Sequence, residues 1–172
     1  TVRSSRNRFA VRLNSSVRRQ TDIFYNGHFR AKMEPIRTVA AVIQNDKGEV
    51  LLVRKRLSTI FIQPGGKTDP NEEPLLALAR ELDEELGVRL DVASTVRLGE
   101  FQAAAVNEPG RMVLAQAYSC SVQGSPTAQA EIEELAWVKP AGPYQVPVAP
   151  LSSQHILPAY VAADSTGLEG GA

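Results

Sequence analysis

The chain has 172 residues, of which 43% are hydrophobic, and equal numbers of basic and acidic residues, 19 of each. This length and composition suit one globular domain with its own core. The single cysteine, Cys120, excludes an internal disulfide and a cysteine-rich zinc site, and no apolar run approaches the roughly 20 residues that a membrane-spanning helix needs.

The N-terminal region is strongly basic. Residues 1–37 hold nine Lys or Arg against two acidic residues, a net charge of +7, so the remainder carries −7. No helical or strand period is evident, and we expect residues 1–35 to be a disordered extension, with DIFYNGHF (22–29) at most a short strand or turn. Two alternatives are organellar targeting, because residues 1–20 are rich in Arg and Ser and free of acids, and nonspecific affinity for RNA.

Strand-like segments follow. TVAAVIQ (38–44) and EVLLVRK (49–55) flank a turn at 45–48, a pattern that predicts a β-hairpin. TIFIQ (59–63) is predicted to be a short strand that ends at Pro64-Gly65-Gly66.

A helix is predicted over residues 74–86. Pro74 suits the first turn of a helix, and Gly87 suits the position after its last turn. Five apolar residues are spaced to share one stripe that faces the core: Leu75, Leu78, Ala79, Leu82 and Leu86.

The remaining elements are predicted from shorter patterns. Residues 94–106 and 111–122 form a second hairpin around the turn 107–110. Other expectations are a strand in the second half of 131–139, a helix at 152–163 that contains Pro158, and a flexible tail at 164–172. Strands and helices interleave without regular βαβ alternation, so the fold class expected is α+β with a mixed sheet.

Carboxylates are crowded at the end of the predicted helix. Glu81, Glu84 and Glu85 lie on a stripe next to the apolar one, whereas Asp83 points elsewhere. Anions are unfavourable at a helix C-terminus, and the only local cation, Arg80, is poorly placed to pair with Glu84. An ordinary solvated face would interleave more cations. The crowding is better explained by Mg²⁺, which binds carboxylates and substrate phosphates together.

The stretch from Gly65 to Val88 resembles the Nudix box, G-x5-E-x7-R-E-U-x-E-E-x-G-U, in which U is apolar. Every constrained position is filled, by Gly66, Glu72, Arg80, Glu81, Leu82, Glu84, Glu85, Gly87 and Val88. The resemblance implies a Nudix-type α/β/α sandwich with a mixed central sheet across residues 36–163.

Nudix proteins typically hydrolyse a nucleoside diphosphate linked to another group, using Mg²⁺ or Mn²⁺. By resemblance, Glu84 and Glu85 are the principal metal ligands, and the carbonyl of Gly65 contributes. Glu81 is either a ligand or the group that orients or deprotonates the attacking water. Glu72 and Arg80 support these groups, with Arg80 fixing the loop and the carboxylates.

A further metal ligand comes from a distal acidic loop in some family members. The candidates here are Glu131, Glu133 and Glu134, of which we favour Glu134, and the alternative for each is a solvated strand entrance.

Substrate contacts are expected from residues that flank the box. Arg54 and Lys67 are candidates to bind phosphates, although exposed salt bridges are the alternative for both. Gln63 and Phe61 are candidates to line a base pocket, with a core position as the alternative for Phe61.

The substrate is predicted by elimination. ADP-ribose hydrolases often carry a Pro about sixteen residues beyond the box, and dinucleoside-polyphosphate hydrolases often carry a Tyr at a similar place; the region LGEFQAAAVNEP (98–109) has neither at the expected spacing. The chain is most similar to MutT-type enzymes that convert a normal or modified (d)NTP to NMP and pyrophosphate. The alternatives are hydrolysis of ADP-ribose or a dinucleoside polyphosphate, and a non-catalytic ligand sensor. We expect a cytoplasmic protein with a nucleotide as substrate and neither membrane nor nucleic acid as partner; the oligomeric state, a homodimer included, stays open.

Overall fold

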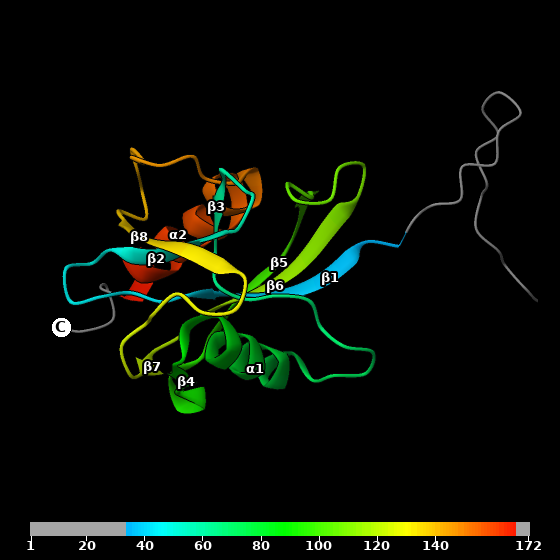
Figure 1. The fold of residues 1–172 in the computed structure, drawn as a ribbon. Helices are drawn as coiled ribbons and strands as arrows, with labels where there is room; N and C mark the ends of the chain where they lie inside the picture. Colours follow the sequence, from blue (N-terminus) through cyan, green and yellow to red (C-terminus); the bar gives the residue numbers. More distant parts are fainter. Residues whose placement is uncertain (1–33, 168–172) are drawn as a thin grey trace, which may run out of the picture. The chain divides into compact units, whose positions relative to one another are not determined.

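The structure is a computed structural model that describes residues 34–167 (Figure 1). The strands are β1 (Ile36–Val42), β2 (Val50–Lys55), β3 (Phe61–Ile62), β4 (Arg89–Leu90), β5 (Val96–Ala104), β6 (Met112–Ser119), β7 (Val122–Gln123) and β8 (Ile132–Val138). The helical segments are α1 (Pro74–Leu86), η1 (Val92–Ser94), η2 (Leu151–Ile156) and α2 (Leu157–Gly167). The predictions for 22–29 and for the basic extension as far as residue 33 lie outside the described residues.

The strands form a mixed arrangement, as expected. β6 is the central strand of one sheet, parallel to β1 and antiparallel to β5. β2 is the central strand of a second sheet, antiparallel to both β3 and β8. The short strands β4 and β7 pair with each other. The α+β class with a mixed sheet is therefore confirmed.

The first predicted hairpin is only partly correct. The turn is present, but β1 and β2 pair only beside it, through the bridge between Gln44 and Val50. Farther along, the loop before α1 takes the edge of β1 that faces away from β6. The N–H groups of Val39 and Ala41 donate to the carbonyls of Gly66 and Pro64, each at 2.9 Å. Because this edge is occupied by the loop, β2 pairs with other strands instead.

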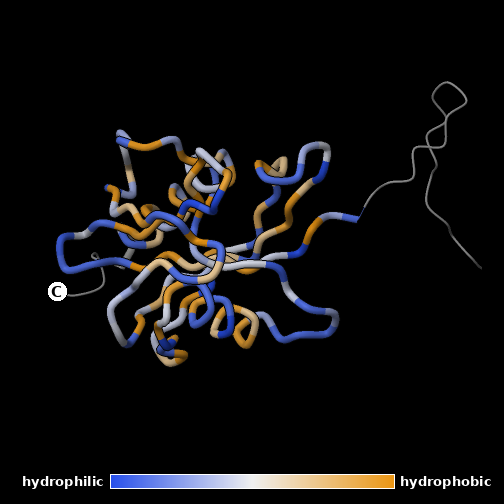
Figure 2. Tube along the Cα trace, in the orientation of Figure 1, coloured by the Kyte–Doolittle hydropathy of each residue, from blue (hydrophilic) through white to orange (hydrophobic). Residues whose placement is uncertain are grey.

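The second predicted hairpin is confirmed by the antiparallel pairing of β5 with β6. Strand β8 occupies all of the 131–139 segment except its ends, so the strand is longer than the expected second half. Figure 2 shows the same organisation in hydropathy: hydrophobic residues gather in the strands between the helices, and the turn after β1 and the loop before α1 are hydrophilic.

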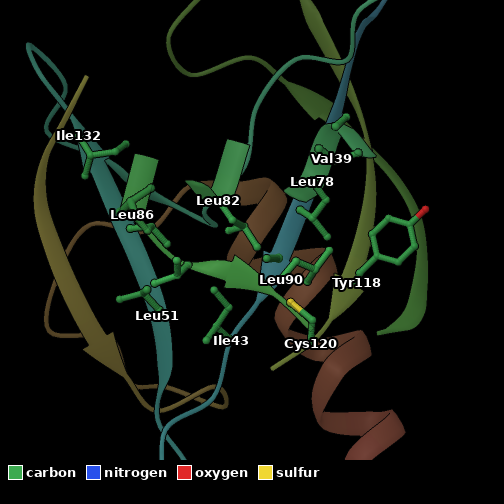
Figure 3. Close-up of a cluster of buried hydrophobic side chains, with 14 residues drawn as sticks. Val39, Ile43, Leu51, Leu78, Leu82, Leu86, Leu90, Tyr118, Cys120 and Ile132 are labelled. Atoms are coloured by element: carbon green, nitrogen blue, oxygen red, sulfur yellow. The ribbon is translucent and has the colours of Figure 1, made fainter. Parts of the chain in front are cut away.

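Strand β1 is buried on both faces, which explains its nearly continuous apolar sequence. Val39 and Ala41 belong to a core cluster beneath α1, whereas Ala40 and Val42 belong to a second cluster against η2 and α2. Figure 3 shows the first cluster, in which the leucines of α1 point toward β1 and β2. The sheets therefore lie between helices, as the sandwich prediction requires.

Helix α1 has the predicted bounds, from Pro74 to Leu86. It ends at Gly87, whose φ of 64° is left-handed and whose N–H donates to the carbonyl of Asp83 at 2.9 Å. The fully buried leucines are Leu78, Leu82 and Leu86. Leu76 is 66% exposed, as expected from its position off the stripe.

The late helix is longer than predicted, because α2 continues to Gly167 into the segment expected to be a flexible tail. Its first part, η2, is a π-type turn in which the N–H of Leu157 donates to the carbonyl of Ser152. Pro158 lies in the first turn of α2, where a missing N–H is tolerated. Among residues 34–167, no helix is both long and apolar enough to cross a membrane.

Candidate active site

The loop before α1 lies closely against β1. Thr38 and Lys67 form a bridge, and the N–H of Thr68 donates to the carbonyl of Arg37 at 3.2 Å. Gly65 has a φ of 129°, and a Cβ atom there would collide with the carbonyl of Val39. Only glycine permits this approach, which brings the loop backbone over the start of the acidic face of α1.

Glu85 is the most deeply buried carboxylate of α1, with 1% of its surface exposed. Its Oε2 accepts a hydrogen bond of 2.9 Å from the N–H of Gly65. Burial raises the pKa of Glu85 to about 7, although the Lys55 ammonium and the Gly65 N–H oppose that rise. The remaining oxygen, Oε1, is 3.1 Å from Nζ of Lys55. Both oxygens of Glu85 are therefore engaged, one by a backbone N–H and the other by a cation.

Lys55, at the end of β2, lies between two carboxylates. Its Nζ is 3.1 Å from Oε1 of Glu85 and 2.8 Å from Oε1 of Glu131. Burial acts to lower the pKa of Lys55, but the attraction of Glu85 and Glu131 outweighs it, so the pKa is raised. Lys55 thus links α1 to the residue that precedes β8.

Arg80 is the cation that connects the acids of α1 to Glu72 and to the loop before the helix. Its guanidinium makes two hydrogen bonds of 3.0 Å to Glu72, one to each carboxylate oxygen, and a third of 3.1 Å to the carbonyl of Lys67. It also donates to Oε1 of Glu81 at 2.7 Å and lies 3.5 Å from Oε2 of Glu84. The same nitrogen, Nη1, reaches Glu81 and Glu84, so both carboxylates meet at one point. Arg80 thus connects Glu72, the loop backbone and the helix acids; the supporting role of Arg80 and Glu72 stays a prediction.

The three helix carboxylates differ in exposure. Glu81 and Glu85 are buried, whereas the side chain of Glu84 is 56% exposed. The carboxylate of Glu81 lies against the backbone of Gly66, where a Cβ would overlap it. Asp83 is exposed.

In the described part of the chain, no group of three His, Cys, Asp or Glu residues stands arranged to hold a metal ion. Arg80 and Lys55 occupy the carboxylate oxygens. The residues nevertheless fit a hard divalent cation, because Glu81, Glu84 and Glu85 offer carboxylate oxygens from one helix and already bind positive charge there, that of Arg80 and Lys55. These three carboxylates would hold Mg²⁺ or Mn²⁺.

The distal acids separate into two groups. Glu133 and Glu134 both bind Arg54, at 2.8 Å each, on the exposed side of β2 and β8. Glu131 instead shares Lys55 with Glu85. The structure therefore does not bring the favoured candidate, Glu134, to the helix carboxylates, because Arg54 holds it; Glu131 is the distal acid that joins them.

A cavity of about 460 Å³ opens beside the loop, within the range of small-molecule sites. Its charged lining residues are Lys55, Lys67, Glu81, Glu108 and Glu131, of which Lys67 and Glu81 belong to the box. Apolar residues of β1, β6 and η2 also line it, including Ile36, Ala40, Val113, Ala115 and Ile156. Two buried polar residues, Gln63 and Ser152, also face it.

Of the four residues predicted to contact the substrate, two line the cavity and two do not. Gln63 and Lys67 line the cavity, and Lys67 forms an ion pair of 2.6 Å with Glu108. Arg54 and Phe61 do not line it. Arg54 is held by Glu133 and Glu134, and Phe61 is buried in the second core cluster, with the Arg54 guanidinium 5.9 Å from its ring centroid.

Two residues of the site were not predicted in their present roles. Ser152 carried no signal in the sequence beyond its place in the late helix. The role of Lys55 could have been found from strand alternation, because Leu51, Val53 and Lys55 are spaced by two and the first two face α1.

Comparison with known proteins identifies the family of the chain. A family model described as the NUDIX domain matches residues 34–159. The CTP pyrophosphohydrolase of Escherichia coli is 32% identical over 123 residues, covering 69% of this chain and 86% of that protein. The 8-oxo-dGTP diphosphatase of Haemophilus influenzae is 40% identical over 57 residues, 31% of this chain and 42% of that protein.

Solved structures show the same fold. The solution structure of the E. coli ORF135 protein superposes with a TM-score of 0.63 at 32% identity, covering 78% of this chain and 94% of that one. The crystal structure of a MutT NUDIX hydrolase from Burkholderia pseudomallei gives a TM-score of 0.63 at 25% identity, covering 74% and 98% respectively.

Proposed function

The chain belongs to the NUDIX family, hydrolases that act on phosphoanhydrides of nucleotide derivatives, and on that premise we propose that it converts a nucleoside triphosphate to the monophosphate and pyrophosphate with Mg²⁺. The alternative substrates are ADP-ribose, a dinucleoside polyphosphate or another nucleoside diphosphate derivative.

One observation carries the proposal. One cavity is lined by charged residues, Lys67 and Glu81 of the box among them, by apolar residues, and by a buried amide, Gln63. A nucleoside triphosphate has the matching parts, a polyanion at one end and a flat heterocycle with polar edges at the other. Lys67 would meet the phosphates by charge-assisted hydrogen bonds, and the apolar wall would take the base.

Water attack on a polyanion requires that its charge be neutralised and a water activated, and bound Mg²⁺ would supply both at the helix carboxylates. The remaining roles fall to residues of the chain. The Gly65 N–H orients Glu85, and Arg80 holds Glu81 against the loop. Glu81 is either a ligand or the group that positions and deprotonates the water.

The names of the relatives support a triphosphate substrate. The CTP pyrophosphohydrolase and the 8-oxo-dGTP diphosphatase are both named for triphosphates. A non-catalytic sensor is the less favoured alternative, because every glutamate of the box is present.

A substrate panel tests the proposal. The purified protein is incubated with the common and oxidised NTPs and dNTPs, ADP-ribose and a dinucleoside polyphosphate, each with Mg²⁺ or with EDTA. Products are identified by ³¹P NMR, and Glu85→Gln serves as the inactive control. We expect Mg²⁺-dependent release of pyrophosphate from triphosphates. Faster cleavage of ADP-ribose or the dinucleotide would replace the substrate class, and no turnover of any compound would favour the sensor.

A further inference from the structure

Gln63 is an unusual buried residue. It follows β3 directly, only 4% of its surface is exposed, and it lines the cavity. Neither its Nε2 nor its Oε1 has a hydrogen-bond partner. Buried amides are nearly always hydrogen-bonded, because leaving donor and acceptor unpaired destabilises the folded protein. An amide left in this state at a cavity wall indicates a partner that enters the cavity.

The surroundings of Gln63 suit a flat, partly apolar partner. The cavity that Gln63 lines also has small and aliphatic side chains of β1 and β6 in its lining, such as Ala40 and Ala115, and Ile156 of η2. The uncharged polar residues that line the same cavity are Thr38, Gln63, Asn107 and Ser152. Each of these four can both donate and accept a hydrogen bond.

We propose that Gln63 hydrogen-bonds the edge of the substrate's nucleobase and that its amide accepts bases of either hydrogen-bond polarity. This inference rests on the proposed function. It adds that one residue, Gln63, recognises the base and that more than one base is accepted. Cytosine presents a ring nitrogen acceptor beside an amino donor, and uracil presents a ring N–H donor beside a carbonyl acceptor. An amide turned by 180° matches either edge with two hydrogen bonds.

Nothing in the described structure holds the amide in one orientation. A hydrogen bond to either atom would have fixed which one is oxygen, and neither atom has such a bond. The other uncharged polar residues that line the cavity can also both donate and accept a hydrogen bond, so they favour neither base. Discrimination between cytosine and uracil should therefore be weak, although loss of the amide should affect both.

The test compares wild type with Gln63→Met, which keeps the side-chain length but removes both polar atoms. The substrates are CTP, UTP and ribose 5-triphosphate, which has no base. We expect wild-type kcat/KM values for CTP and UTP within about tenfold of each other. Gln63→Met should lower both by about 10- to 100-fold, the range for losing two hydrogen bonds to a base edge, and leave ribose 5-triphosphate unchanged. Gln44→Met, the same change at an exposed glutamine, is the control.

Thermal stability supplies an independent readout. Removing two buried, unpaired polar atoms should raise the melting temperature of Gln63→Met by about 2–10 °C without nucleotide. A merely structural role for the amide predicts the reverse, a less stable variant. A higher melting temperature together with weaker turnover of base-containing substrates would identify an amide retained for its ligand.

Three results would overturn the inference while the proposed function stands: a preference above about 100-fold between CTP and UTP in wild type, equal losses on all three substrates in Gln63→Met, or a lower melting temperature for that variant. If wild type cleaves no triphosphate at all, the proposed function itself fails, and the inference fails with it.

Discussion

Arg80 binds Glu72 through two hydrogen bonds of 3.0 Å, one to each oxygen of the carboxylate. This bidentate pairing leaves Nη1 free to reach Glu81 at 2.7 Å, and Nη2 also contacts the carbonyl of Lys67. The contacts hold the pKa of Glu72 at about 2, so this pair stays ionised throughout the physiological pH range. The loop before α1 is thereby fixed to the helix that carries the acids.

The first prediction concerns this geometry. Arg80→Lys keeps the positive charge but cannot bind Glu72 and Glu81 together, because an ammonium lacks the planar fork of a guanidinium. We expect turnover to fall by about 10- to 100-fold, as for the loss of residues that orient metal ligands. The measurement is kcat/KM against Mg²⁺ concentration. Arg89→Lys is the matched control, because Arg89 is exposed in β4 and its guanidinium donates to the Gln123 side chain. An equal loss in both variants would contradict a special role for Arg80.

The second prediction concerns pH. The pKa of Glu85 rises from its ordinary 4.5 to about 7 on folding, chiefly through burial. The stabilising effect of the bound proton is complete below pH 4.5 and is lost as the pH rises through 7, a loss of up to about 3 kcal/mol. In EDTA, urea unfolding between pH 5 and 8 should show wild type losing stability relative to Glu85→Gln. Parallel pH profiles for the two proteins would contradict the raised pKa.

Divalent metal should reverse that loss. Mg²⁺ binding to the ionised carboxylate stabilises the folded state, so at pH 8 the melting temperature of wild type should rise with Mg²⁺ concentration. Glu85→Gln should respond much less. A rise of the same size in both proteins would place metal binding elsewhere.

The sequence predicted those elements in which one local pattern dominates. The bounds of α1 follow from Pro74, Gly87 and a leucine stripe, and the box residues follow from their fixed spacing. Pairing that depends on distant segments was harder to predict. The hairpin at β1 was wrong beyond its turn because the loop at Pro64 and Gly66 takes the strand edge, and nothing in residues 38–55 reveals that competition.

The distal part of the site shows the same limit. Glu131, Glu133 and Glu134 are adjacent in sequence and equivalent in type, so their order alone could not separate them. Strand pairing separates them, since β8 lies against β2 with Glu134 opposite Arg54 and Ile132 opposite Lys55. Glu131 therefore shares Lys55 with Glu85, whereas Arg54 holds Glu134.

The third prediction follows from that separation. Glu131→Gln should weaken Mg²⁺ dependence and turnover, because Lys55 would then pair with Glu85 alone and compete with the metal for it. Glu134→Gln should leave turnover unchanged, because Arg54 keeps Glu133 and lies outside the cavity lining. Both variants are assayed for rate across a Mg²⁺ titration. A larger effect of Glu134→Gln than of Glu131→Gln would restore Glu134 as the distal ligand.

The last prediction concerns Glu84 and Glu85, the two acids of α1 expected to be the principal metal ligands. Glu84→Gln and Glu85→Gln keep size but remove charge, and turnover should fall by about 10² to 10⁴, with weaker Mg²⁺ affinity in each. The two variants should differ in their free energy of unfolding in EDTA. Glu84 is more than half exposed, so Glu84→Gln should change that free energy by only about a few tenths of a kcal/mol. Glu85→Gln removes a buried charge and should change it more.

Asp83→Asn is the matched control on the same helix, because Asp83 is exposed and is not among the residues that line the cavity. It should alter neither turnover nor Mg²⁺ affinity. A solvated acidic face would make all three substitutions behave alike, so the contrast between them matters more than any single rate. Small and equal effects of Glu84→Gln, Glu85→Gln and Asp83→Asn on turnover would therefore refute a metal site on this face of α1.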